Sequence, residues 1–143
     1  VLEGLAARHA ARRATPAEIE ELDTLAGTMR RASAQPTRWL DRHEAFHDAL
    51  CTLSGRPRLA AELRRLRAVV RPQLRLYAER NREPETLGHE HEVIVDALRD
   101  RDAKRAERLV AAHVTANAAA IMALLGVEAP ATPGRQRATA KAR

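Results

Sequence analysis

Residues 37–59, TRWLDRHEAFHDALCTLSGRPRL, decide the fold. Apolar side chains recur every three or four positions in the first part of this stretch, which is the spacing of one face of an α-helix. The pattern predicts a helix from about Thr37 to Ser54, and Gly55 is its expected C-cap. Pro57 then opens the next helix, because a first helical turn tolerates proline. The stretch therefore predicts two consecutive helices joined by a tight turn.

Further helices are predicted on the N-terminal side and along the segment that follows Pro57. One helix begins at or before Val1 with no N-cap in front of it, so we expect the chain to be part of a longer protein. The capping box Thr15-Pro16-Ala17-Glu18 begins a second helix. The helix that starts at Pro57 continues through Pro72 with a kink, because proline removes one backbone hydrogen bond.

The C-terminal half adds two helices and a tail. One helix is expected over about 85–99, and Asp102 caps another that ends at Gly126. Almost no segment alternates with the period of two that strands require. We therefore expect an all-α, antiparallel bundle of six or seven helices over residues 1–126, followed by a basic, flexible tail over 127–143.

Composition limits the classes of protein to which the chain can belong. Its 143 residues suit one domain, and 45% of them are hydrophobic. No run of about 18 apolar residues could cross a membrane, and no signal-peptide pattern opens the chain. The single cysteine, Cys51, excludes an intrachain disulfide and fits a reducing, cytoplasmic location.

The net charge of +6 does not by itself indicate nucleic-acid binding. Half of it comes from residues 127–143, which carry four basic residues and one acidic residue. The remaining charge is spread over helices of mixed sign, and no aromatic residues stand between the basic ones to stack on bases. We expect no direct DNA binding by the folded body.

The motif His43-Glu44-Ala45-Phe46-His47 has the HExxH form of zinc proteases. Two histidines four positions apart lie on one face of a helix, so both imidazoles can bind one metal ion. His91 and His113 lie on the apolar faces of two later predicted helices. Burying several imidazoles is unfavourable unless each finds a partner, and one divalent cation could satisfy all four. The pattern favours zinc, nickel, cobalt, copper or iron over calcium and magnesium. His9 and His89 are not expected to take part.

Two enzymatic interpretations compete with a binding site. A zinc-dependent hydrolase is the alternative function, but residues after His47 lack the extended HExxHxxGxxH form, and no predicted strand could align a peptide. Glu44 is then expected to face solvent. A di-metal oxidase needs a second Glu-x-x-His unit, and Gly88 and Val110 stand where its glutamate would be. We expect the protein not to be an enzyme.

Five segments resemble one known family. They are VLEGLAA (1–7), FHDAL (46–50), SGRPRL (54–59), EHEVIVDAL (90–98), and Asp102-Ala103 followed by Ala106 and His113. They are similar to the Leu-Glu-x-x-Ala, FHxAL, SGNPxL, EHxxIxxAI and DAxxA…H motifs of the FCD domain, the C-terminal effector-binding domain of FadR-type regulators in the GntR superfamily. The resemblance covers roughly residues 1–125.

The resemblance implies a metal site, an effector and a DNA-binding partner domain. Its three metal-binding histidines fall on His47, His91 and His113, and His43 stands where the family has Asp or Asn. The expected ion is a divalent transition metal, zinc or nickel, and the expected effector is a small carboxylate in the bundle interior, with Arg67 and Arg71 as candidate contacts. By resemblance, a winged helix-turn-helix domain lies upstream and alone contacts DNA, and the regulator is a homodimer.

Overall fold

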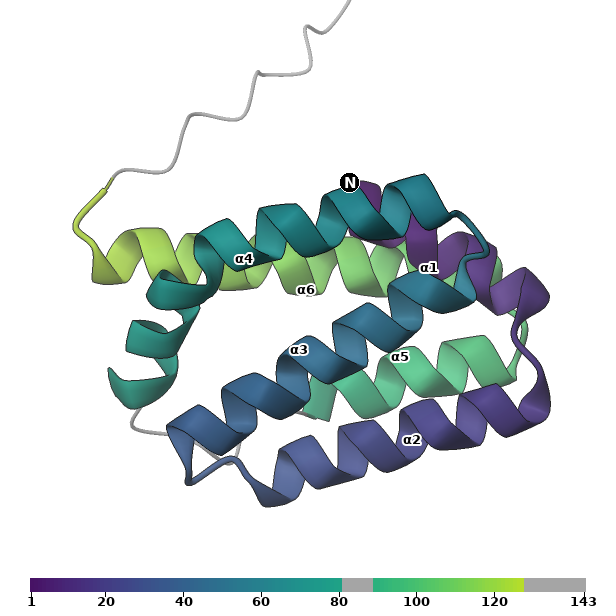
Figure 1. Cartoon of the computed structure of the whole chain (residues 1–143), viewed down its shortest axis with the longest axis horizontal. Helices are drawn as coiled ribbons and strands as arrows, with labels where there is room; N and C mark the ends of the chain where they lie inside the picture. Colours follow the sequence, from purple (N-terminus) through teal and green to yellow (C-terminus); the bar gives the residue numbers. More distant parts are fainter. Residues whose placement is uncertain (81–88, 128–143) are drawn as a thin grey trace, which may run out of the picture.

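The computed structural model describes residues 1–80 and 89–127, and these are folded into helices and short connections. The helices are α1 (Leu2–Arg13), α2 (Pro16–Arg31), α3 (Pro36–Leu53), α4 (Pro57–Arg80), α5 (His89–Arg99) and α6 (Ala103–Leu124). They form one bundle in which no described residue belongs to a strand (Figure 1). The predicted all-α bundle, with six helices, is confirmed. None of the described helices is long and apolar enough to cross a bilayer.

The predicted capping residues start the helices as expected. The Thr15 hydroxyl accepts from the Glu18 amide at 3.3 Å, and the Glu18 carboxylate accepts from the Thr15 amide at 2.7 Å, which completes the capping box. Asp102 accepts from the Arg105 amide at 2.9 Å and starts α6. Gly55 and Gly126 end their helices with φ angles of +64° and +68°, a conformation that glycine adopts without steric strain.

One helix boundary differs from the sequence-based prediction, the position of Pro72 agrees with it, and two predicted features lie outside the described residues. Helix α3 begins at Pro36 rather than Thr37, because proline suits the first helical position. Pro72 lies inside α4, which continues past it to Arg80 and changes direction before its end (Figure 1). The predicted start of the fifth helix at Glu85 lies outside the described residues, as does the predicted tail after Val127.

Helix α1 packs closely against α6, so the first and last described helices lie side by side (Figure 1). Gly4 makes this approach possible. A Cβ atom at this position would lie 2.8 Å from the Glu107 carbonyl oxygen and 3.3 Å from the Ala111 Cβ. Ala7 and Ala10 on the same helix are fully buried. Small side chains on α1 therefore bring its backbone directly onto α6.

The apolar core lies between α2, α3, α5 and α6. Its fully buried large side chains come mainly from α2, α3 and α5: Leu22, Met29, Trp39, Leu40, Phe46, Leu50, Ile94 and Leu98. Phe46 also borders the histidines, because its ring centroid lies 4.9 Å from that of His91. The core therefore fixes one wall of the histidine cluster described next.

Candidate metal centre

Four histidines from three helices meet inside the bundle. His43 and His47 come from α3, His91 from α5 and His113 from α6, and each is at most 6% exposed. One ring nitrogen from each histidine can be chosen so that all four atoms lie within 4.8 Å of one another. The i, i+4 spacing on α3 supplies two imidazoles on one face, and the apolar faces of α5 and α6 bring the other two inward.

The distances between these nitrogens are close to those between nitrogens that bind the same metal ion. Nε2 of His91 lies 3.4 Å from Nε2 of His47. Four nitrogens that bind a tetrahedral zinc at about 2.1 Å lie about 3.4 Å apart. The widest pair in the cluster, at 4.8 Å, would therefore contract by about 1.4 Å around a shared zinc ion.

Glu3 of α1 holds the outer side of His47. Its Oε2 lies 2.8 Å from Nδ1 of His47, although the angle falls short of a well-formed hydrogen bond. Burial raises the pKa of the Glu3 carboxyl, but His47 and the Arg67 guanidinium outweigh burial and lower it to about 2. Glu3 is therefore ionised and favours a proton on Nδ1 of His47, which leaves the Nε2 lone pair directed at the cluster.

His113 is oriented in a similar way by two other side chains. Its Nδ1 lies 2.5 Å from a carboxylate oxygen of Glu90, and its Nε2 lies 3.1 Å from the side-chain nitrogen of Asn117. With the proton on Nδ1, His113 donates to Glu90, and its Nε2 accepts from the Asn117 amide, a contact that a metal ion on Nε2 would replace. A carboxylate behind a ligating imidazole is the usual partner of that group in metal sites.

His43 lacks such a partner. Both of its ring nitrogens are buried without a hydrogen bond to any described residue. Burial, followed by the neighbouring histidines, lowers the pKa of His43 well below its ordinary value, so the ring is neutral. A buried imidazole with two unsatisfied nitrogens is unfavourable on its own, and a metal ion bound to one of them would relieve this.

The donor set fits a divalent transition metal. Four imidazoles suit zinc, nickel, cobalt or copper, while calcium and magnesium prefer oxygen ligands. The described residues that could hold such an ion are the four histidines, with Glu3 and Glu90 behind two of them. His9 and His89 are outside this cluster, and the exposed ring of His89 lies 3.7 Å from Glu92.

We expect the metal-free protein to lose stability as the pH falls below about 6.5. Burial is the largest cause of the lowered pKa of both His43 and His113, so these rings stay neutral in the folded protein at a pH where the unfolded chain is protonated, near 6.5. The stability contributed by the neutral rings is therefore complete above pH 6.5 and declines below it, until the folded rings are protonated as well.

Urea unfolding in the presence of a chelator, at steps from about pH 8 to about pH 5, measures this effect. A His43→Leu variant is the control and should show a weaker dependence on pH. A wild-type midpoint that stays constant or rises over this range would contradict the assignment of neutral, buried rings.

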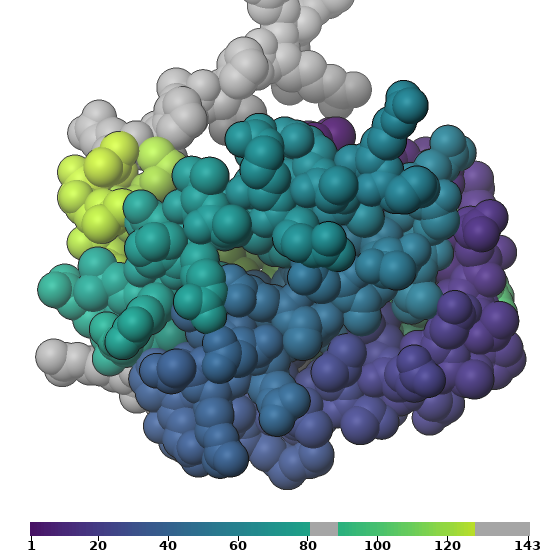
Figure 2. Space-filling view, viewed as in Figure 1, coloured from purple at the N-terminus to yellow at the C-terminus, as the bar shows by residue number. Residues whose placement is uncertain are grey.

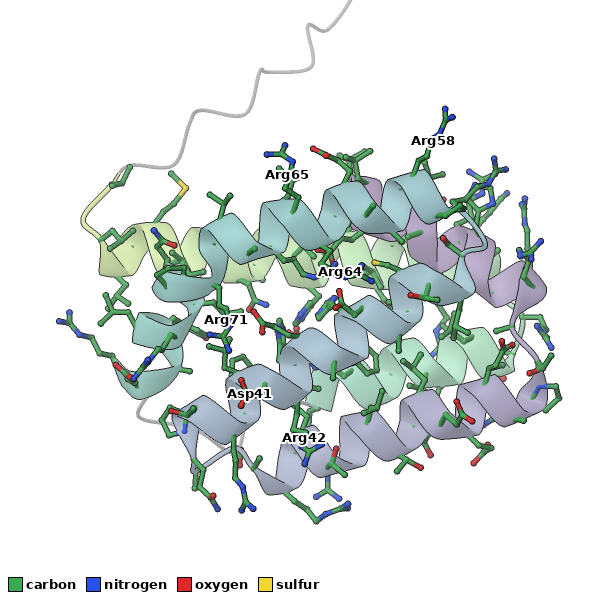
Figure 3. The ribbon with its side chains drawn as sticks, in the orientation of Figure 1. Asp41, Arg42, Arg58, Arg64, Arg65 and Arg71 are labelled. Carbon is green, nitrogen blue, oxygen red and sulfur yellow. The ribbon has the colours of Figure 1, made fainter. Side chains whose placement is uncertain are left out.

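The two predicted effector arginines occupy different positions. Arg67 lies beside the cluster, pairs with Asp48 and approaches Glu3 at 3.5 Å. Arg71 reaches from α4 toward Asp41 of α3, at 2.8 Å (Figure 3). It also pairs with Glu44 at 2.8 Å. Both guanidinium groups therefore already have carboxylate partners.

Glu44, expected to face solvent, is 29% exposed, and Arg71 lies within hydrogen-bond distance of both of its carboxylate oxygens. Sequence reasoning missed Glu3, Glu90 and Asn117 as neighbours of the histidines. Glu3 and Glu90 stand in the segments that carry the Leu-Glu and Glu-His motifs, and this position in the motifs could have suggested that they lie near the histidines. Asn117, one turn after His113, could have been suggested by helical spacing alone.

A cavity of about 390 Å³ opens beside the histidines. Its walls come from α1, α3, α4 and α6, and His43, His47 and His113 form part of its lining. Figure 2 shows its opening between α4 and α3, with atoms of α6 visible behind. A cavity of this size is suited to a small organic molecule.

Comparisons with known proteins agree with this architecture. The family model of the FCD domain matches residues 1–116. Among solved structures, the chain is similar to E. coli McbR/YncC, with a TM-score of 0.75 and 22% sequence identity. The match covers 86% of this chain and 63% of that one, so this chain spans less than two thirds of that protein's length. No curated protein matches the chain. At this identity the structural likeness shows a shared fold.

Proposed function

Because the chain belongs to the FCD domain family, we propose that it is the effector-sensing part of a GntR-type transcriptional regulator. The observation that carries the proposal is the convergence of four buried imidazoles beside a cavity that a small molecule could enter. We propose that these histidines bind one divalent transition metal, with zinc or nickel the expected ions. The protein then acts by binding, and no catalytic role is assigned to it.

All four histidines are proposed as ligands of the ion. His47, His91 and His113 are the ligands implied by the family motifs, and His43 is the fourth. Glu3 and Glu90 orient His47 and His113 through the ring nitrogens that face away from the ion. A neutral imidazole at position 43 leaves a bound dication with more positive charge than the Asp found in some family members would, and this favours an anionic effector.

The effector is proposed to be a small carboxylate that binds in the cavity next to the histidines. A bound metal would supply the positive charge that attracts it. The contacts of Arg67 with Glu3 and Asp48 support a positioning role, in which Arg67 keeps Glu3 against His47. Direct contact of Arg67 or Arg71 with the effector stays a prediction, and Arg71 is not among the described residues that line the cavity.

Control of DNA binding is assigned to an upstream winged helix-turn-helix domain, and the intact regulator is proposed to be a homodimer. The effector must then favour one arrangement of the bundle over another for its binding to be transmitted. Glu3 offers a direct connection, because it joins the first turn of α1 to His47.

Calorimetry and thermal unfolding of the 143-residue chain test the function. We expect one equivalent of zinc to bind and, at about 100 times its Kd, to raise Tm by about 10 °C, because an ion that binds only the folded state stabilises it. Selected small carboxylates should raise Tm again in the zinc-loaded protein, and magnesium should have no effect.

Two results would contradict this function. Failure to bind any transition metal would remove the proposed site. Metal-dependent hydrolysis of peptides, abolished by Glu44→Gln, would favour the zinc hydrolase, in which Glu44 would have to leave Arg71 and act as general base.

A further inference from the structure

The cavity has two chemically different ends. At one end lie His43, His47 and His113, and most of the remaining wall is apolar. The apolar wall is formed by the α4 side chains Leu63, Leu66, Val70 and Leu74 and the α6 side chains Val114 and Ile121. An occupant that reaches beyond the histidines therefore contacts hydrocarbon from both helices.

The charged groups around the cavity are already paired with each other. Arg67 is the only lysine or arginine side chain among the described residues that line it, and Arg67 contacts Glu3 and Asp48. Glu44, another lining residue, is paired with Arg71. Apart from the exposed amino group of Val1 at the rim, the described residues along this wall offer a second anionic group on an occupant no unpaired cation. Burying such a group without a partner is strongly unfavourable.

The mouth of the cavity leaves apolar side chains in contact with water. Leu66 is 39% exposed and Val70 is 46% exposed, although both line the cavity. An apolar body seated between α4 and α6 would cover these side chains, and the removal of apolar surface from water is favourable.

From these observations we infer that the effector is an amphipathic monocarboxylate, with its anionic group toward the histidines and an apolar body between α4 and α6. The inference rests on the function proposed above and narrows its ligand class from carboxylates in general. The volume of about 390 Å³ is near the lower end of the range for small-molecule sites, so the apolar body is short or of medium length.

A series of carboxylates tests the inference on the zinc-loaded chain. Calorimetry would compare acetate, butanoate, hexanoate and octanoate with octanedioate and citrate. We expect Kd to fall about three- to fourfold for each added methylene until the cavity is filled. Octanedioate should bind more weakly than octanoate, because its far carboxylate would lie among apolar side chains.

Two variants at neighbouring positions distinguish an effect of the cavity wall on ligand binding from a general effect of the substitution on α4. Val70→Asn places an amide in the wall and should weaken octanoate binding by about five- to tenfold, with little effect on acetate. Val69→Asn is the matched control, because Val69 is 65% exposed and does not line the cavity. The Tm of each variant without ligand reports whether it is folded.

The possible failures can be told apart. Tighter binding of citrate or octanedioate than of octanoate would overturn the inference and leave the carboxylate sensor intact. Equal weakening of octanoate binding by Val69→Asn and Val70→Asn would also overturn it. If the zinc-loaded chain binds no carboxylate at all, the proposed function fails and the inference fails with it.

Discussion

Replacement of His91 by alanine is expected to weaken zinc binding by about a hundredfold or more. The free energy of zinc binding is shared among only four ligands, so the loss of one removes a large part of it. His91 contributes the single imidazole from α5, and its Nε2 lies 3.4 Å from that of His47. None of the other cluster histidines comes from α5, and the second imidazole on that helix, His89, is exposed and lies outside the cluster. The same variant should lose most of the rise in Tm that zinc gives the wild-type protein.

The measurement is a competition titration against a chromophoric chelator, together with thermal unfolding with and without zinc. His89→Ala is the matched control, since His89 lies two residues away on α5 with its side chain 71% exposed. It should keep wild-type zinc affinity. Unchanged affinity in His91→Ala, in a protein that is still folded, would exclude the four-histidine site.

Replacement of Gly4 by alanine is expected to lower the free energy of unfolding by about 2 kcal/mol, through overpacking of the interface between α1 and α6. The added Cβ would lie 2.8 Å from the backbone oxygen of Glu107, which cannot move without shifting α6. Alanine otherwise favours a helix over glycine by about 1 kcal/mol, so the expected loss already includes this gain.

Gly27 of α2 provides the control with the opposite sign. A Cβ there would meet only the flexible end of Arg31, at 3.4 Å. Gly27→Ala should therefore stabilise the protein by about 0.5–1 kcal/mol. Urea unfolding of both variants measures the contrast. A Gly4→Ala protein as stable as the wild type would show that α1 and α6 do not approach as closely as described.

The local signals in the sequence were sufficient for the helices. The signals that start and end the helices act over only four or five residues, so the groups that they contact are close neighbours in the sequence. They are the Thr15 capping box, the Asp102 cap and the glycines at 55 and 126. The inward position of the four histidines also followed from helical periodicity, because each lies on the apolar face of its own helix.

Contacts between distant helices could not be predicted in the same way. Glu3 meets His47 because α1 packs beside α3 as well as α6, and periodicity gives the buried face of a helix without naming its neighbour. The same limit applied to Arg67 and Arg71, whose carboxylate partners Asp48 and Glu44 lie on another helix. Both were named from the sequence as candidate contacts for a carboxylate effector, and the tertiary structure pairs both with carboxylates of the protein itself.

The packing of α1 on α6 also affects how fast the histidine cluster assembles and comes apart. The histidines come from α3, α5 and α6, so the cluster is complete only after segments separated by up to 70 positions have docked. Contacts between distant segments form late in folding, because the chain must first be closed into a large loop. A metal held by such late contacts slows unfolding more than it speeds folding. For a metal bound as proposed, the lifetime of the loaded state would be set by how rarely α6 separates from α1 and α3.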